Sequence, residues 1–209
     1  MVATLIASSV MSVAASPEKM VSGELHAIAS ETSYRGGLVT PPLAKPRFTL
    51  TDTAGAAFDF GAQTEGYVTL LFFGYTHCPN ECPLHMAAIA MALRDVPADV
   101  RNQVKVVFVT ADPARDTVAV LRAWLANFDK QFIGLTGSPA LIEAAQLSAK
   151  IPAATKTVFT SRPYEVAHAS FVLAYTKDNL AHVIYPGGVT AIDWKHDLSR
   201  LVNEKWSSR

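Results

Sequence analysis

The sequence predicts an α/β fold in which a central mixed sheet is flanked by helices. Residues 67–74 are a continuous run of aliphatic, β-branched and aromatic side chains, which is typical of a strand buried on both faces, and residues 104–110 predict a second buried strand. Between these runs, residues 78–94 carry apolar side chains at helical spacing. Near the C-terminus, residues 169–175 and 180–185 flank a polar turn and predict an antiparallel hairpin.

Further segments complete the predicted order of elements. Asp116 or Thr117 is expected to cap a helix, and Ser138 before Pro139 matches an N-cap followed by proline in the first turn. The segments are a small hairpin that begins at residues 48–52, helices over residues 116–128 and 138–149, and a closing helix over residues 194–209. A βαβ unit that leads into a ββα unit is typical of a thioredoxin-like fold.

Composition narrows the class of protein. The chain has 209 residues, of which 50% are hydrophobic and 17% are charged, and its formal net charge is zero. This length predicts one domain with a substantial core. The hydrophobic content is too high for intrinsic disorder, and the lack of a basic excess disfavours general nucleic-acid binding. Two cysteines can supply only one disulfide, so a disulfide-stapled scaffold is excluded.

The first 46 residues are predicted to lie outside the domain. Residues 1–15 are small, apolar and uncharged, which is typical of a secretory signal or the remnant of a membrane anchor. Because no basic residue precedes this run, a frayed terminus is the alternative. Residues 16–46 contain paired glycines and paired prolines and predict an irregular, extended arm. The domain is therefore expected over residues 47–209.

The two cysteines, Cys78 and Cys82, lie where the first buried strand ends and its helix begins. Backbone N–H groups at a helix N-terminus favour the thiolate form. On a regular helix, residues four apart have Cβ atoms about 5–6 Å apart, whereas a disulfide needs about 3.5–4.5 Å, so a disulfide here is expected to be labile. Two thiolates on one face also suit a soft metal such as Cu(I). The alternative is a pair of inert, buried thiols.

The residues alone leave a third metal ligand open. His85 lies seven residues beyond Cys78, on the same helical face, and His168 precedes the C-terminal hairpin. Met86 has the helical spacing of a core residue. Asp112 and Asp116 are interpreted as a turn residue and a helix cap rather than as a carboxylate site. A second close pair of ligands, which a structural zinc site needs, is missing from the sequence.

Several stretches of the sequence match motifs of one family. They are residues 72–79 (FFGYTHCP) followed by Cys82-Pro83, residues 109–117 (VTADPARDT) followed by residues 132–137 (FIGLTG), and residues 48–52 (FTLTD). Together they resemble the Sco/SenC family of thioredoxin-fold copper proteins, which help to metallate the dinuclear copper site of cytochrome c oxidase. The resemblance runs from about residue 46 to residue 200, and the first two motifs are specific in combination.

This resemblance implies a copper site formed by Cys78, Cys82 and His168, for Cu(I) and also for Cu(II). It implies a metallochaperone rather than an enzyme, one that delivers copper to the copper site of cytochrome c oxidase or helps that site to mature. The implied partners are the copper-site subunit of the oxidase and other copper chaperones, with no nucleic acid. The implied location is outside the cytoplasm, in a bacterial periplasm, with membrane contact only through an N-terminal anchor.

The chain departs from the family pattern close to the expected ligands. Ala167 and Ala169 flank His168, where the family usually has an aspartate before the histidine and a hydroxyl residue after it. Asn80 and Glu81 lie between the cysteines, where the family favours an aspartate and an apolar residue. Because neighbouring groups orient a ligating histidine, copper affinity or redox tuning is expected to differ. The added carboxylate is expected to raise the pKa of the thiols.

The same two thiols support a second hypothesis, which is a thiol–disulfide oxidoreductase that uses Cys78 and Cys82 to reduce cysteines of a partner. His168 discriminates between the two hypotheses, because thiol exchange does not require it. A peroxidase of a related thioredoxin-like family is disfavoured. Such an enzyme needs a threonine three residues before the reactive cysteine, and Thr76 lies two residues before Cys78.

Overall fold

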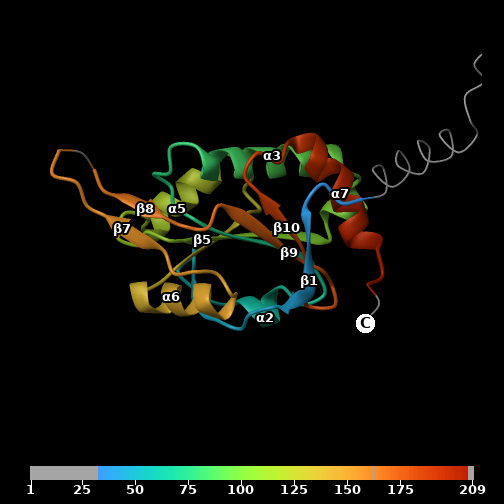
Figure 1. Ribbon diagram of the computed structural model, residues 1–209, viewed down its shortest axis with the longest axis horizontal. Coiled ribbons are helices and arrows are strands. Elements are labelled where there is room, and N and C mark those ends of the chain that lie inside the picture. The colour runs from blue at the N-terminus through green and yellow to red at the C-terminus, as the bar shows by residue number, and fades with distance from the viewer. Residues whose placement is uncertain (1–32, 162, 207–209) are drawn as a thin grey trace, which may run out of the picture. The chain divides into compact units, whose positions relative to one another are not determined.

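An eight-stranded mixed sheet organises the computed structural model, which describes residues 33–161 and 163–206 (Figure 1). The order across the sheet is β1-β10-β9-β4-β5-β6-β2-β3, and β7 and β8 form a separate two-stranded sheet. The strands are β1 (Gly37–Ala44), β2 (Thr49–Asp52), β3 (Ala57–Asp59), β4 (Val68–Gly74), β5 (Val104–Thr110), β6 (Ile133–Thr136), β7 (Thr155–Thr157), β8 (Glu165–Ala167), β9 (Phe171–Tyr175) and β10 (Leu180–Pro186).

Helices cover both faces of this sheet. In Figure 1, α3, α5 and α7 lie on one side of the strands, and α2 and α6 lie on the other. The helices are α2 (Phe60–Gln63), α3 (Glu81–Asp95), α4 (Ala98–Arg101), α5 (Val118–Leu125), α6 (Pro139–Ser148) and α7 (Ala191–Asn203). The predicted α/β class, a mixed sheet flanked by helices, is therefore confirmed.

Strand β4 lies at the centre and separates two hydrophobic cores. All seven of its residues are buried, as the apolar run predicts. Leu70 and Phe72 belong to the core under α3, α5 and α7, whereas Leu71 and Phe73 belong to the core under α2 and α6. This division follows from the two-residue period of a strand, because a strand covered on both faces needs apolar residues at every position. β4 runs parallel to β5 and antiparallel to β9.

The predicted elements are confirmed, with shifts at some of their ends. The hairpins β2–β3 and β9–β10 pair as expected. Ser138 caps α6, and Thr117 rather than Asp116 caps α5 by accepting from the Val120 N–H group. Helix α7 begins three residues earlier than predicted because Thr190 and Asp193 form a capping box. Strand β6 was not predicted, since four residues that include a glycine carry little periodic signal.

The arm predicted to be irregular is partly a strand, and that expectation is corrected. Residues 37–44 form β1, which pairs antiparallel with β10 at the edge of the sheet. The register shifts between Leu38 and Leu43, the segment that holds the paired prolines. Prolines are tolerated at an edge or a bulge because no partner strand needs their missing N–H groups. The compact unit that contains the sheet begins at Tyr34.

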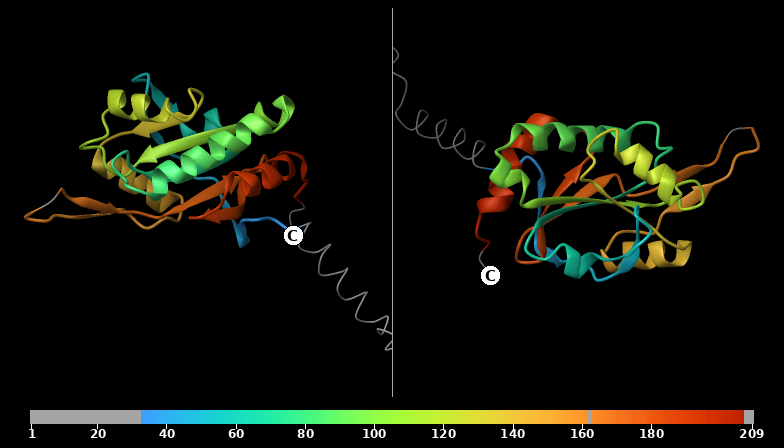
Figure 2. Two further views of the ribbon diagram at one scale, coloured as in Figure 1. Left: turned by 90° about the horizontal axis from the view of Figure 1, so that it is seen from above. Right: turned by 180° about the vertical axis from the view of Figure 1, so that it is seen from behind.

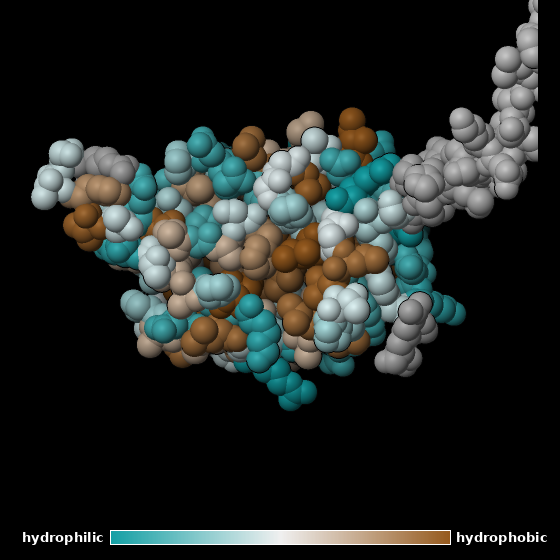
Figure 3. All heavy atoms as spheres, viewed as in Figure 1, coloured by the Kyte–Doolittle hydropathy of each residue, from teal (hydrophilic) through white to brown (hydrophobic). Residues whose placement is uncertain are grey.

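Strand β1 borders a hydrophobic area of the sheet. In Figure 3, hydrophobic side chains gather near the centre of the visible face, over β9 and β10. Leu43, Phe171 and Ile184 are half-buried against the core. The predicted signal or anchor at residues 1–15, and the arm as far as residue 32, lie outside the described residues. Within residues 33–161 and 163–206, no helix has the length and apolar character needed to cross a membrane.

Candidate metal site

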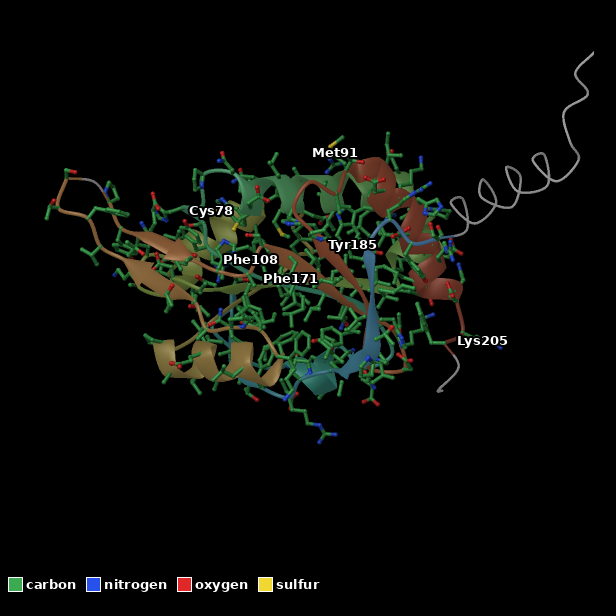
Figure 4. The ribbon with its side chains drawn as sticks, in the orientation of Figure 1. Cys78, Met91, Phe108, Phe171, Tyr185 and Lys205 are labelled. Carbon is green, nitrogen blue, oxygen red and sulfur yellow. The ribbon has the colours of Figure 1, made fainter. Side chains whose placement is uncertain are left out.

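The three predicted ligands meet at the carboxyl end of β4. The Sγ atoms of Cys78 and Cys82 and a ring nitrogen of His168 all lie within 4.8 Å of one another. Among the residues that the structure describes, no other three His, Cys, Asp or Glu side chains gather so closely. Cys78 comes from the loop after β4, Cys82 from the first turn of α3, and His168 from the connection between β8 and β9. Figure 4 shows Cys78 between the start of α3 and the base of the β7–β8 hairpin.

Cys78 lies before the helix, not on it, which corrects the helical-face interpretation. Helix α3 begins at Glu81, and Asn80 has non-helical backbone angles of φ −133° and ψ −67°. The Cys78 N–H group instead donates to the Tyr75 carbonyl at 3.1 Å, which closes a turn. The i, i+4 spacing of a regular helix therefore does not set the distance between the two sulfur atoms. Both thiols are free, with Cys78 half-buried and Cys82 buried.

His85 is not part of this cluster. Its ring is buried on the Phe72 ring, with centroids 5.0 Å apart, and its Nε2 atom lies 3.4 Å from the Ser170 carbonyl oxygen. Burial lowers the pKa of His85, which favours the neutral ring. Met86 is fully buried in the core, as predicted from its spacing. The structure therefore brings His168, and not His85, into the cluster with the cysteines.

The orientation of His168 is set by its own backbone neighbour and by two aromatic rings. Its Nδ1 atom lies 3.1 Å from the Ala169 carbonyl oxygen. A carbonyl only accepts, so Nδ1 carries the hydrogen and the Nε2 lone pair faces the Cys82 sulfur, 3.5 Å away. The ring packs edge-on against Tyr75 and Phe72, with centroids 5.5 and 5.9 Å apart. A side chain at position 167 or 169 is therefore not needed to fix the tautomer.

The two thiols share one proton unequally. The Cys82 thiol donates to Cys78 and lowers the pKa of Cys78 to about 3, with further hydrogen bonds from the backbone N–H groups of Asn80 and Cys82, while burial acts in the opposite direction. The same hydrogen bond raises the pKa of Cys82, and burial adds to the rise. The resting pair is thus a Cys78 thiolate beside a Cys82 thiol. The predicted effect of Glu81 on the thiols stays a prediction.

Alkylation of the metal-free protein tests this division of roles. An ordinary thiol with a pKa of about 8.5 is only about 0.03% ionised at pH 5, and its ionised fraction rises tenfold per pH unit. Since the pKa of Cys78 is about 3, its thiolate is already fully formed at pH 5. We expect the rate of Cys78 alkylation by iodoacetamide to stay level from pH 5 to pH 8. We expect Cys82, which is buried and protonated, to react much more slowly. Peptide mass spectrometry measures both rates. A rate of Cys78 alkylation that rises tenfold per pH unit would contradict the assignment of Cys78 as the thiolate.

Asp116 positions the cysteine loop, a role that differs from the predicted helix cap. The side chain is fully buried and accepts hydrogen bonds from the Thr76 N–H group at 2.9 Å and the Thr76 hydroxyl at 2.6 Å. It also accepts from the Thr110 hydroxyl at 2.7 Å. These bonds join the loop after β4 to the end of β5. Thr76 is two residues from Cys78, so this carboxylate holds the loop that carries the half-buried Cys78 thiolate.

Replacing Asp116 by alanine is expected to destabilise the protein by about 3 kcal/mol. The reason is that hydrogen bonds to a charged group contribute about 1.5–3 kcal/mol each and buried donors left without a partner add a cost. Urea denaturation measures the free energy of unfolding. The matched control is Asp95→Ala, because the exposed Asp95 has only a distant ion pair, 3.8 Å from Lys195. The control is expected to change stability by less than about 0.5 kcal/mol. Equal effects of the two substitutions would refute the role of Asp116.

A second polar cluster anchors the segment that leads to His168. Asp112 is buried, accepts from the Tyr164 hydroxyl at 2.9 Å and forms an ion pair with Arg115. The Tyr164 ring has the Arg115 guanidinium 3.8 Å from its centroid and the Lys156 ammonium 3.3 Å from it. The predicted turn at Asp112 is confirmed by backbone bonds to its carbonyl. Figure 2 shows the β7–β8 hairpin projecting from the sheet, and these contacts hold the start of β8 against the segment that follows β5.

Comparison with known proteins agrees with this geometry. The family described as SCO1/SenC matches residues 39–203. A solved structure of ScoI from Bradyrhizobium japonicum with copper bound is 31% identical, covers 76% of this chain and 99% of its own, and has a TM-score of 0.68. Apo Sco1 from Thermus thermophilus, solved in solution, is 26% identical, covers 81% of this chain and 98% of its own, and has a TM-score of 0.72. The predicted thioredoxin-like fold is confirmed.

Curated relatives match over part of their length. The mitochondrial SCO1 homolog 1 of Arabidopsis thaliana is 37% identical over 86 residues, which is 41% of this chain and 26% of that protein. The mitochondrial SCO2 homolog of Bos taurus is 31% identical over 120 residues, which is 57% of this chain and 45% of that protein. The chain thus spans less than half the length of these two relatives.

Proposed function

Because the chain belongs to the SCO1/SenC family, we propose that it is a copper-binding assembly factor for cytochrome c oxidase. In this proposal, Cys78, Cys82 and His168 hold one copper ion, as Cu(I) and also as Cu(II). The protein delivers the ion to the copper site of the oxidase or helps that site to mature. The observation that carries the proposal is the convergence of two thiol sulfur atoms and one imidazole nitrogen within 4.8 Å.

The donor set suits copper. Thiolates are soft ligands that select Cu(I), and imidazole is a good ligand for both oxidation states. The Nε2 lone pair of His168 already faces the sulfur of Cys82 at 3.5 Å. Cys78 and Cys82 would supply two sulfur ligands and His168 one nitrogen ligand, and these three atoms already lie within 4.8 Å of one another.

The exposure of the ligands supports metal exchange rather than permanent storage. Cys82 is buried, whereas Cys78 and His168 are half-buried at the surface. An incoming ligand from a partner can therefore reach the metal from the side of Cys78. We place this exchange outside the cytoplasm, with the copper-site subunit of the oxidase as recipient and other copper chaperones as donors.

A transfer experiment tests this function. The Cu(I)-loaded protein is mixed anaerobically with the metal-free, reduced copper-site domain of the oxidase subunit. The two proteins are then separated and their copper is counted. We expect most of the copper to move to the oxidase domain. If the copper stays on the original protein, or if the protein binds none, the delivery role is wrong.

The asymmetry of the two thiols also supports a second function, the reduction of a disulfide in a partner. A half-buried thiolate at Cys78 and a protonated, buried Cys82 are suited to the attacking and resolving steps of thiol exchange. However, a strongly stabilised thiolate favours the reduced state of the pair, so the pair is a weak reductant. The same experiment with an oxidised oxidase domain distinguishes the roles. Formation of free thiols in the domain without copper transfer would favour the oxidoreductase.

A further inference from the structure

A pocket lined by charged side chains lies at the opposite end of β4 from the cysteines. Its volume is about 480 Å³, and Lys45, Arg47, Asp59 and Glu65 contribute its charged groups. Lys45 follows β1 directly, and α2 and the end of β1 lie close together in Figure 1. The Lys45 amine bonds to Thr69 at the start of β4, whereas Gly74 at the other end adjoins Cys82. Five strand residues separate these points by about 16 Å.

The Lys45 amine is held by neutral groups. Nζ donates to the Thr64 carbonyl at 3.1 Å and to the Thr69 hydroxyl at 3.4 Å. The Lys45 backbone N–H group donates to the Asn179 carbonyl at 2.8 Å, which fixes the start of the side chain. In the described part of the chain, no carboxylate forms an ion pair with Nζ. An ammonium has three N–H donors, and the two neutral acceptors here bond to it without pairing its charge directly with a carboxylate.

The charges around Lys45 act in both directions, and burial dominates. Burial lowers the pKa of Lys45 to about 8; the negative charges of Glu65 and Asp178 oppose this shift and the positive charge of Lys105 adds to it. Asp59 caps α2 by accepting from the Ala62 N–H group at 2.9 Å. At pH 7.5 roughly a quarter of the Lys45 amines are neutral, against about 0.1% for an ordinary lysine.

We propose that Lys45 is a nucleophile and that its pocket is a modification site for small acyl phosphates. The carbonyl carbon of the acyl group is the electrophile, and Arg47 in the same pocket supplies a cation for the phosphate. The Nζ lone pair forms a bond to the carbonyl carbon, the bond from that carbon to the phosphate oxygen breaks, and phosphate leaves with both electrons. The amine proton passes to water, and the product is an amide at Lys45. This inference is independent of the copper site.

Acetylation by acetyl phosphate tests the proposal on the full chain. At pH 7.5, we expect Lys45 to be acetylated at least tenfold faster than the exposed Lys130 and Lys150, as followed by peptide mass spectrometry. In urea-unfolded protein, this advantage is expected to disappear. If the rate at Lys45 equals or falls below that of the exposed lysines in the folded protein, the proposal is overturned.

Paired charge substitutions around the pocket separate nucleophilicity from simple exposure. Glu65→Gln removes a charge that stabilises the ammonium, so acetylation of Lys45 is expected to accelerate about two- to threefold. Lys105→Gln removes a positive charge that destabilises the Lys45 ammonium, so the rate of Lys45 acetylation is expected to fall. Arg47→Gln is expected to slow the acetylation of Lys45 by acetyl phosphate at least threefold. The rate of its acetylation by acetic anhydride, an uncharged reagent, is expected to stay the same. Unchanged rates in all three variants would also overturn the proposal.

Discussion

Copper(I) is expected to bind to Cys82→Ala and to His168→Ala at least tenfold more weakly than to the unaltered chain. Each substitution removes one of three donor atoms that lie within 4.8 Å of one another. A tenfold loss corresponds to about 1.4 kcal/mol, and the loss of a ligand is expected to cost at least as much as the 10–100-fold losses seen when outer-shell partners of metal ligands are removed. An anaerobic titration of each protein against a competing Cu(I) chelator measures the affinities.

The matched control for this prediction is His85→Ala. His85 is also a buried histidine close to the site, but its Nε2 atom faces the Ser170 carbonyl rather than a sulfur. Its substitution is expected to lower stability while leaving copper affinity within about threefold of the unaltered chain. The ligand assignment is wrong if His168→Ala binds copper like the unaltered chain and His85→Ala does not.

Gly74→Ala is expected to disrupt both the core and the copper site. A Cβ atom at this position would lie 2.7 Å from the Cys82 sulfur, 2.9 Å from the Phe108 ring and 3.0 Å from the Phe72 ring. All three neighbours are fully buried, so they can give way only by displacing other core atoms. Overpacking of a dense core costs about 1–3 kcal/mol and shifts the neighbouring side chains. We therefore expect a loss of that size in urea denaturation, together with at least a tenfold loss of Cu(I) affinity.

Gly37→Ala provides the control for Gly74→Ala. Gly37 is also a strand glycine, but a Cβ atom there would lie 3.4 Å from the nearest atom, a methyl group of Ile184, which is an ordinary contact. Its substitution is expected to change stability by less than about 0.5 kcal/mol. If both variants behave alike, or if Gly74→Ala retains full copper affinity, the close approach of Cys82 to β4 is not what positions its sulfur.

The parts of the fold that the sequence predicts well are those whose residues act locally. β4 and β5 are identified by mainly apolar and β-branched runs, because a strand buried on both faces has few positions for polar side chains. Ser138 and Pro139 mark the start of α6 for a similar reason, since capping involves neighbours in sequence. The location of the cysteines at the carboxyl end of β4 follows directly from that strand.

The geometry of the cysteine loop was not predictable from local patterns. Cys78-Pro79 fits the start of a helix, yet α3 begins only at Glu81. Hydrogen bonds from Thr76 to Asp116 hold this loop, and those two residues are 40 positions apart in the sequence. Asp116 was accordingly interpreted as a cap, because a side chain that binds a distant backbone group leaves no signature among its neighbours.

The third ligand illustrates the same limit. Residue types alone left His85 and His168 open, and the resemblance to a known family favoured His168. In the structure, the β7–β8 hairpin is anchored by Tyr164, and His168 rather than His85 lies with the sulfur atoms. The group that fixes the His168 tautomer is the Ala169 carbonyl, which every residue type would supply. The expected effect of Ala167 and Ala169 on copper affinity or redox tuning stays a prediction.

We propose that Cys78, Cys82 and His168 together hold one copper ion. X-ray absorption spectroscopy of the Cu(I)-loaded protein tests it most directly, since it counts the ligand atoms around the metal. For the unaltered chain, we predict one copper per chain with two sulfur ligands and one imidazole ligand. For His168→Ala, we predict that the imidazole contribution is lost and the two sulfur ligands remain. An imidazole ligand that persists in His168→Ala, or fewer than two sulfur ligands in the unaltered chain, would contradict the claim.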